Sequence, residues 1–122
     1  MWTYKQQSGE LWHGDPEPAA VGYSGAGEGK NNPAMQVVHA IGPIPQGEWL
    51  IQGPPVDSRL HGPFVMRLIP IIPSAALGRA GFLIHGDSKE HPGMASEGCI
   101  IMPRNVRERV WNSGDRELLV VA

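Results

Sequence analysis

Short apolar runs alternate along the chain with breaks rich in glycine and proline. Runs of three to six residues that contain aromatic or β-branched side chains predict strands. They lie at Trp2–Lys5, Glu10–Trp12, Val21–Ser24, Gly47–Gln52, Phe64–Ile69, Phe82–His85, Cys99–Met102 and Glu117–Val121. The first two runs flank a turn-like Gln-Ser-Gly and predict a hairpin. Short strands punctuated so regularly favour a β-sandwich or a barrel.

One segment has a helical pattern. Val106 and Val110 lie one turn apart, Pro103 suits the first position of a helix, and Gly114 suits the position just after its end. We therefore expect a short helix, packed between the last two strands. The glycine-rich stretch Gly14–Asn32 is expected to be mostly loop.

Composition supports a single loop-rich β domain. Glycine (16) and proline (12) make up 28 of the 122 residues, about twice their average combined share of roughly 12%, which disfavours a helical bundle. Because 41% of the residues are hydrophobic, the chain can still bury a core. Its length suits one domain, residues 1–122, without room for a second.

The net charge and the length of the apolar stretches limit which partners the protein can have. Ten Lys and Arg residues and twelve Asp and Glu residues give a net charge of −2, and neither sign forms a block. Nucleic acid is therefore not an expected partner. No apolar stretch approaches the roughly 20 residues that span a bilayer. The first residues, MWTYKQQSGE, also lack the sections of a signal peptide, so we expect synthesis in the cytoplasm without signal-dependent export.

Reactive side chains concentrate between Phe82 and Arg104. His85 ends one predicted strand and Cys99 begins the next, so a single loop separates them. A nucleophilic cysteine needs a base or a positive field nearby, because an ordinary thiol is mostly protonated at neutral pH. His85 is the candidate base. Gly98 would let the backbone approach a substrate, with the amides of Gly98 and Cys99 facing an oxyanion, which suits acyl transfer.

The same residue types also suit roles without acyl transfer. Cys99 is the only cysteine, which excludes an intrachain disulfide, and a lone cysteine in a strand more often packs as a small hydrophobe. A metal site could use His85, Asp87, His91 and Cys99, but their spacing matches no compact zinc pattern. The Gly25–Lys30 run lacks the residues of a nucleotide-binding loop. No metal or cofactor is therefore expected.

The His85 and Cys99 cluster resembles the signature of YkuD-type L,D-transpeptidases, in which His-Gly precedes Ser/Thr-His-Gly-Cys by a loop of this length. Here the motif reads His85-Gly86 and then Ser96-Glu97-Gly98-Cys99. The segment Gly42–Ile51 is similar to one that precedes a strand in that superfamily. Over nearly its whole length, the chain resembles most closely the L,D-transpeptidase-related effectors of bacterial type VI secretion systems.

The resemblance implies a mainly β fold, a compact L,D-transpeptidase-like β-sandwich with one short helix after the strand of the catalytic cysteine. It implies that Cys99 attacks the amide between meso-diaminopimelate and the terminal D-alanine of a peptidoglycan tetrapeptide stem, with His85 as its base. The product is a thioester. Water would resolve it as an L,D-carboxypeptidase, whereas a free D-amino acid would exchange the terminal residue as an L,D-transpeptidase.

Further positions acquire roles from the same resemblance. Ser96, Gly98 and Gly86 would shape the loop and the oxyanion site, and Tyr23 and Ser24 would line the substrate pocket. Arg104 would pair with a carboxylate of the stem.

Two positions depart from the family pattern. Glu97 replaces the usual histidine of the motif, and Ile101 stands where arginine is common. These departures put acceptor use, and hence crosslinking, in doubt. A carboxylate that faced Cys99 would also raise the pKa of its thiol.

The implied biology is that of an antibacterial toxin. The expected partners are peptidoglycan tetrapeptide stems, the type VI secretion apparatus and a cognate periplasmic immunity protein, with the protein acting as a monomer in the periplasm of the target cell. The competing hypothesis is a non-catalytic wall-binding or interaction domain that retains the fold. It is favoured if Cys99 is buried and far from His85.

Overall fold

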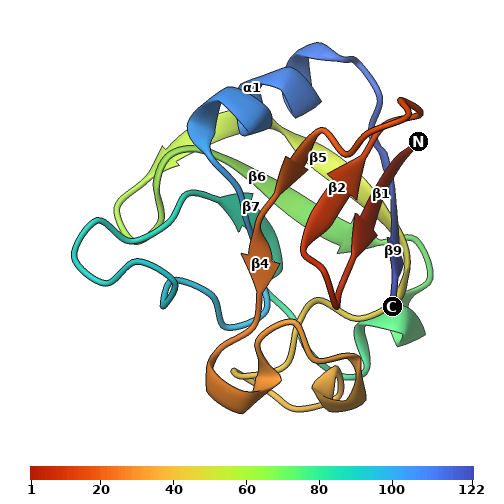
Figure 1. Cartoon of the computed structure of the whole chain (residues 1–122), viewed down its shortest axis with the longest axis vertical. Coiled ribbons are helices and arrows are strands. Elements are labelled where there is room, and N and C mark those ends of the chain that lie inside the picture. The colour runs from red at the N-terminus through yellow and green to blue at the C-terminus, as the bar shows by residue number, and fades with distance from the viewer.

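Strands dominate the computed structural model, which describes all 122 residues (Figure 1). The strands are β1 (Trp2–Lys5), β2 (Glu10–Trp12), β3 (Ala20–Val21), β4 (Tyr23–Ser24), β5 (Gly47–Ser58), β6 (Gly62–Pro70), β7 (Leu83–His85), β8 (Ile100–Ile101) and β9 (Glu117–Val121). They form one nine-stranded sheet in the order β3-β2-β1-β9-β5-β6-β7-β8-β4. The predicted mainly β fold with one short helix after the Cys99 strand is confirmed, and its strands belong to one nearly closed sheet.

Two pairs of neighbouring strands run parallel, and each needs a long connection. β1 pairs with β9, which places the first and last strands side by side. β7 pairs with β8, so that His85 lies opposite Ile101. The connection between β7 and β8 is the loop 86–99, which leaves the sheet on one side of the molecule (Figure 1). The other pairs are antiparallel, with the long β5 and β6 hairpin at the centre.

The predicted strand Val21–Ser24 is divided in the structure. It is broken at Gly22 into β3, which pairs with β2, and β4, which pairs with β8. A side chain at Gly22 would overlap the carbonyl oxygen of Ile101, so glycine allows the backbones to approach closely there.

The central hairpin is longer than its apolar pattern predicts. β5 continues to Ser58, past the prolines at positions 54 and 55. Its register with β6 shifts after Gln52, and such an irregularity lets a strand continue past residues that cannot donate to the ladder.

The single α-helix, α1, spans Arg104–Asn112. Pro103 precedes it as the capping residue and is not its first residue, while Gly114 follows its end with a φ of 75°. The helix contacts β6 and β7 and does not pack between the last two strands. Val106 and Val110 pack into the core, and the buried side chain of Arg107 donates hydrogen bonds to the carbonyls of Pro63, Phe64 and Met102.

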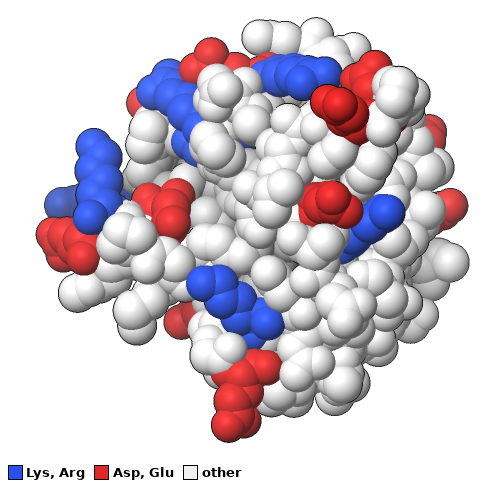
Figure 2. Space-filling view, viewed as in Figure 1, with Lys and Arg blue, Asp and Glu red and all other residues white.

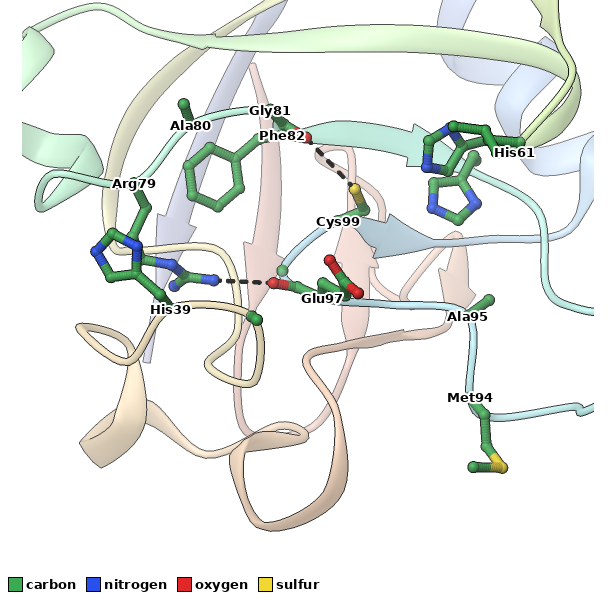
Figure 3. A pocket seen from close by; sticks show the side chains of 14 residues that line it. His39, His61, Arg79, Ala80, Gly81, Phe82, Met94, Ala95, Glu97 and Cys99 are labelled. Atoms are coloured by element: carbon green, nitrogen blue, oxygen red, sulfur yellow. Dashed lines mark hydrogen bonds between the residues drawn. The ribbon is translucent and has the colours of Figure 1, made fainter.

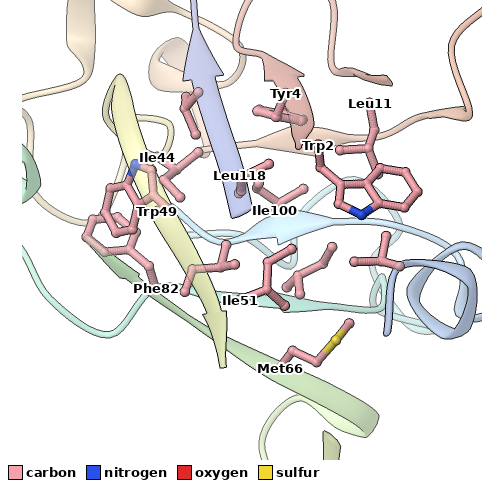
Figure 4. Packing of buried hydrophobic residues seen from close by; sticks show 14 of the residues in the cluster. Trp2, Tyr4, Leu11, Ile44, Trp49, Ile51, Met66, Phe82, Ile100 and Leu118 are labelled. Atoms are coloured by element: carbon pink, nitrogen blue, oxygen red, sulfur yellow. The ribbon is translucent and has the colours of Figure 1, made fainter. Parts of the chain in front are cut away.

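The core fills the inside of the curved sheet (Figure 4). Trp2, Tyr4 and Leu11 contribute from the first hairpin, and Trp49 and Leu118 from the centre of the sheet. The rings of Trp49 and Phe82 meet edge to face, with centroids 4.9 Å apart. Because Phe82 also borders the pocket described below, the core supports one wall of the candidate site.

The surface carries mixed charge. In the face that Figure 2 shows, Lys and Arg side chains alternate with Asp and Glu side chains over a mostly uncharged surface. No helix of the protein has the length and apolar character needed to cross a membrane.

Candidate active site

The parallel pairing of β7 and β8 brings His85 and Cys99 to the same face of the sheet. Ile101 lies opposite His85, and side chains alternate along a strand, so Cys99, Ile101 and His85 project to one side. His85 and Cys99 both line a pocket of about 580 Å³ (Figure 3). The structure therefore brings the two residues of the predicted catalytic pair into one cavity.

Four loop segments distant in sequence form the walls of this pocket. They are the loop before β5, the turn between β5 and β6, the loop that leads into β7, and the end of the loop that leads into β8. The lining residues are His39, Ala40, Leu60, His61, Arg79, Ala80, Gly81, Phe82, His85, Met94, Ala95, Glu97, Gly98 and Cys99.

His85 is held in the form that a general base requires. Its Nδ1 lies 2.8 Å from the carbonyl oxygen of Gly86. Because a carbonyl can only accept, Nδ1 carries the hydrogen and Nε2 carries the lone pair. Nε2 is buried and has no hydrogen-bond partner in the protein. Burial also lowers the pKa of His85, which keeps the imidazole neutral.

A second imidazole packs against the first. His61, in the turn between β5 and β6, has its ring centroid 4.7 Å from that of His85. The Ser58 hydroxyl accepts a 3.2 Å hydrogen bond from the His61 amide, which holds this turn. His61 adds to the lowering of the His85 pKa.

Cys99 is present as a buried thiol. Cys99 is only 8% exposed, and its Sγ donates a 3.8 Å hydrogen bond to the carbonyl of Gly81. The pKa of Cys99 is raised to about 11, mainly by burial and in part by Glu97, while the backbone amide of Leu83 and the charge of Arg79 act in the opposite direction. No hydrogen bond joins Sγ to His85, so the thiolate is not preformed.

Ser96 fixes the backbone that carries the cysteine. Its Oγ donates a 2.7 Å hydrogen bond to the carbonyl of Cys99 and accepts from the amides of Gly25 (2.9 Å) and Gly98 (3.1 Å). Gly98 has a φ of 137°, in the range that favours glycine. Ser96 and Gly98 thus shape the loop, but the Gly98 amide is directed to Ser96 and is not free for an oxyanion.

Ser24 and Tyr23 support the site from behind and do not line the pocket. Ser24 is fully buried, donates from its hydroxyl to the carbonyl of Gly98 at 3.1 Å, and accepts from the amide of Ile44 at 2.8 Å. The Tyr23 hydroxyl donates to Asp87 at 2.6 Å and accepts from the amide of Ala95 at 2.9 Å. Tyr23 therefore connects the two ends of the segment 87–95.

Arg104 and Gly86 border a second cavity of about 740 Å³. This cavity shares His61 and His85 with the first, so the two adjoin at these rings. Arg104 is exposed and pairs with Glu108 at 2.8 Å. It lies apart from the pocket of Cys99, at the far side of His85.

Sequence reasoning missed Arg79, the most highly connected side chain of the site. It is buried, and its Nη atoms donate to four carbonyl oxygens, of Gln36, Gly42, Pro43 and Glu97. A lone arginine between Gly78 and Ala80 carries no local signal of this role, because its partners are distant in the chain. No sequence pattern assigns a role to His61 either, although it precedes a glycine in the break between two predicted strands.

The alternative of a metal centre has no structural support. No group of three His, Cys, Asp or Glu side chains is close enough to hold an ion. His85, Asp87, His91 and Cys99 therefore do not form the zinc site considered from their residue types.

A comparison with known families identifies one that covers most of the chain. Residues 19–121 match the family described as the Tlde1 domain. Among curated proteins, no match to the chain was found.

Proposed function

Because the chain belongs to the Tlde1 domain family of type VI secretion L,D-transpeptidase effectors, we propose that it is a cysteine-dependent enzyme acting on peptidoglycan stem peptides. Cys99 is the nucleophile and His85 is the base. The observation that carries this proposal is the shared pocket, which is lined by Cys99 and by His85, whose buried Nε2 has no hydrogen-bond partner. An unpaired polar atom in a cavity points to a functional role.

The proposed reaction proceeds through a thioester. His85 Nε2 takes the proton of the Cys99 thiol, and Sγ attacks the carbonyl carbon between meso-diaminopimelate and D-alanine. As the tetrahedral intermediate collapses, the C–N bond breaks and the imidazolium returns its proton to the amine of D-alanine. The Gly86 carbonyl stabilises that imidazolium through Nδ1.

Water completes the L,D-carboxypeptidase reaction. His85 removes a proton from the water, and the resulting oxygen nucleophile attacks the thioester. The C–S bond breaks, the Cys99 thiolate takes the proton back from the imidazolium, and a tripeptide stem is released. A D-amino acid in place of water gives exchange of the terminal residue. Since the Gly98 amide is held by Ser96, the Cys99 amide is the remaining candidate donor to the oxyanion.

The proposed cellular role follows from this chemistry. Removal or replacement of D-alanine depletes normal tetrapeptides and weakens wall growth. The protein would be made in the cytoplasm, delivered by the type VI apparatus into the target periplasm as a monomer, and neutralised there by a cognate immunity protein.

The decisive experiment is mass spectrometry of tetrapeptide muropeptides incubated with the protein, with and without added D-methionine. Without the additive, wild type is expected to convert tetrapeptide to tripeptide. With D-methionine present, it is expected also to form stems that end in D-methionine. Cys99→Ala should fold and be inactive, and His85→Ala should lose most activity. A fully active Cys99→Ala protein would refute the mechanism.

A non-catalytic wall-binding domain is the second candidate. It is favoured by the 8% exposure of Cys99 and by the absence of a hydrogen bond between its thiol and His85. Incubation of the folded, reduced protein with tetrapeptide muropeptides separates the two functions. Recovery of unchanged tetrapeptide supports the binding domain.

A further inference from the structure

Glu97 provides the only carboxylate that lines the pocket of Cys99. Figure 3 shows this carboxylate directed toward the cysteine, while Arg79 binds the backbone carbonyl of the same residue. The Glu97 residue is exposed, and its side chain forms no hydrogen bond or salt bridge within the protein. The backbone is thus fixed, and the charge is free to receive a ligand.

The other charged group of the pocket is already satisfied. Arg79 is only 7% exposed and uses its terminal nitrogens on four backbone carbonyls. The imidazole of His85 is kept neutral by burial, which lowers its pKa. In the pocket of Cys99, the charge that remains available to a ligand is therefore the negative charge of Glu97.

The adjoining cavity beyond His85 carries both signs of charge. It is lined by Asp87, Lys89 and Arg104. Lys89 is exposed and forms no salt bridge, whereas Arg104 pairs with Glu108. A ligand that spans both cavities would thus meet a lone carboxylate beside Cys99 and mixed charge beyond His85.

We propose that Glu97 is an ammonium subsite, which recognises the free side-chain amine of diaminopimelate in the stem. This inference rests on the proposed function. At the reactive end of a tetrapeptide stem, that ammonium is the only cation, and it belongs to the residue that supplies the scissile carbonyl. A stem that is cross-linked through this amine has it acylated and uncharged. The enzyme therefore selects stems that are not cross-linked through this amine.

The proposed contact between the ammonium and Glu97 also explains why a carboxylate lies beside the nucleophile. An unpaired Glu97 raises the pKa of the Cys99 thiol and opposes thiolate formation. An ammonium bound to Glu97 cancels that charge, so occupation of the subsite makes the thiol easier to ionise. Binding of the correct substrate and activation of the nucleophile are then linked.

The test compares two tetrapeptide substrates, one with the diaminopimelate amine free and one with it acetylated. Wild type is expected to favour the free amine by about tenfold or more in kcat/KM, the range of a charge-assisted hydrogen bond. Glu97→Gln should bring the two substrates to similar values. Glu48→Gln, an exposed carboxylate on β5, is the matched control and should keep the preference.

A binding measurement separates this inference from the proposed reaction. Calorimetry with Cys99→Ala protein should show weaker binding of acetylated than of free tripeptide, and the double variant Cys99→Ala with Glu97→Gln should show no difference. Turnover of both substrates at equal kcat/KM by wild type would overturn the proposed ammonium subsite but would still support the proposed enzymatic reaction. Glu97-dependent binding without any turnover would support the subsite and reject the reaction.

Discussion

The hydroxyl of Ser96 and the carbonyl of Cys99 are joined by a hydrogen bond of 2.7 Å. The same hydroxyl accepts from two backbone amides, of Gly25 and Gly98. Ser96→Ala would leave all three buried groups without this partner. We expect a loss of about 2–4 kcal/mol in the free energy of unfolding, together with loss of activity, measured by urea denaturation and muropeptide turnover.

The control for this change is Ser74→Ala, at an exposed position of the short helix Pro73–Ala76. It should leave both measurements unchanged. If Ser96→Ala retained wild-type stability, the three hydrogen bonds would not be what holds the Cys99 backbone.

Gly98→Ala tests the close approach of the guanidinium. A Cβ at Gly98 would overlap Nη2 of Arg79, at a residue whose φ is 137°. Gly47 has the same φ of 137°, and a Cβ there would meet only the Cβ of Ala75, at 3.2 Å, so Gly47→Ala reports mainly backbone strain. We expect Gly98→Ala to lower the melting temperature clearly more than Gly47→Ala. Equal effects would show that the guanidinium moves aside freely.

Arg79→Lys retains the positive charge but loses the planar arrangement of donors that binds four carbonyls. A lysine cannot reach four carbonyls, so buried acceptors lose their donors. The expected destabilisation is about 3 kcal/mol, with a loss of activity. Arg67→Lys, at an exposed residue of β6, should change neither. An active and fully stable Arg79→Lys protein would contradict the structural role assigned to the guanidinium.

The buried thiol should be slow to react. Burial raises the pKa of Cys99 to about 11, so native protein holds less thiolate at pH 8 than unfolded protein does. The rate of alkylation by iodoacetamide should rise with pH toward a midpoint near pH 11, and Glu97→Gln should lower that midpoint. The stability from this group is complete below the ordinary thiol pKa and is lost as pH rises through the folded value. Rapid native alkylation at pH 8 would contradict this prediction.

Local patterns predicted the framework of the site well, because strand runs and turn residues are neighbours in sequence. Apolar runs placed His85 and Cys99 at the ends of strands that the structure pairs as β7 and β8. The roles of Ser24 and Tyr23 could not be predicted from their spacing. The partners of both side chains come from loops that are distant in the sequence.

Interactions of a single side chain with remote backbone escape sequence patterns for the same reason. Arg79 lies in a loop without periodicity, and its acceptors become neighbours only when the loops around residues 36–43 and 97 meet in the fold. The division of the predicted strand at Gly22 likewise depends on the approach of Ile101, which no local signal indicates.

The hydrogen bonds of Arg79 also have a dynamic consequence. One guanidinium connects the segment that includes residues 36, 42 and 43 to the residue two positions before Cys99. These segments cannot open separately without breaking charged hydrogen bonds, so local unfolding should involve both together. A partner that binds the surface loop around residues 36–43 would therefore change the mobility of the nucleophile without touching it.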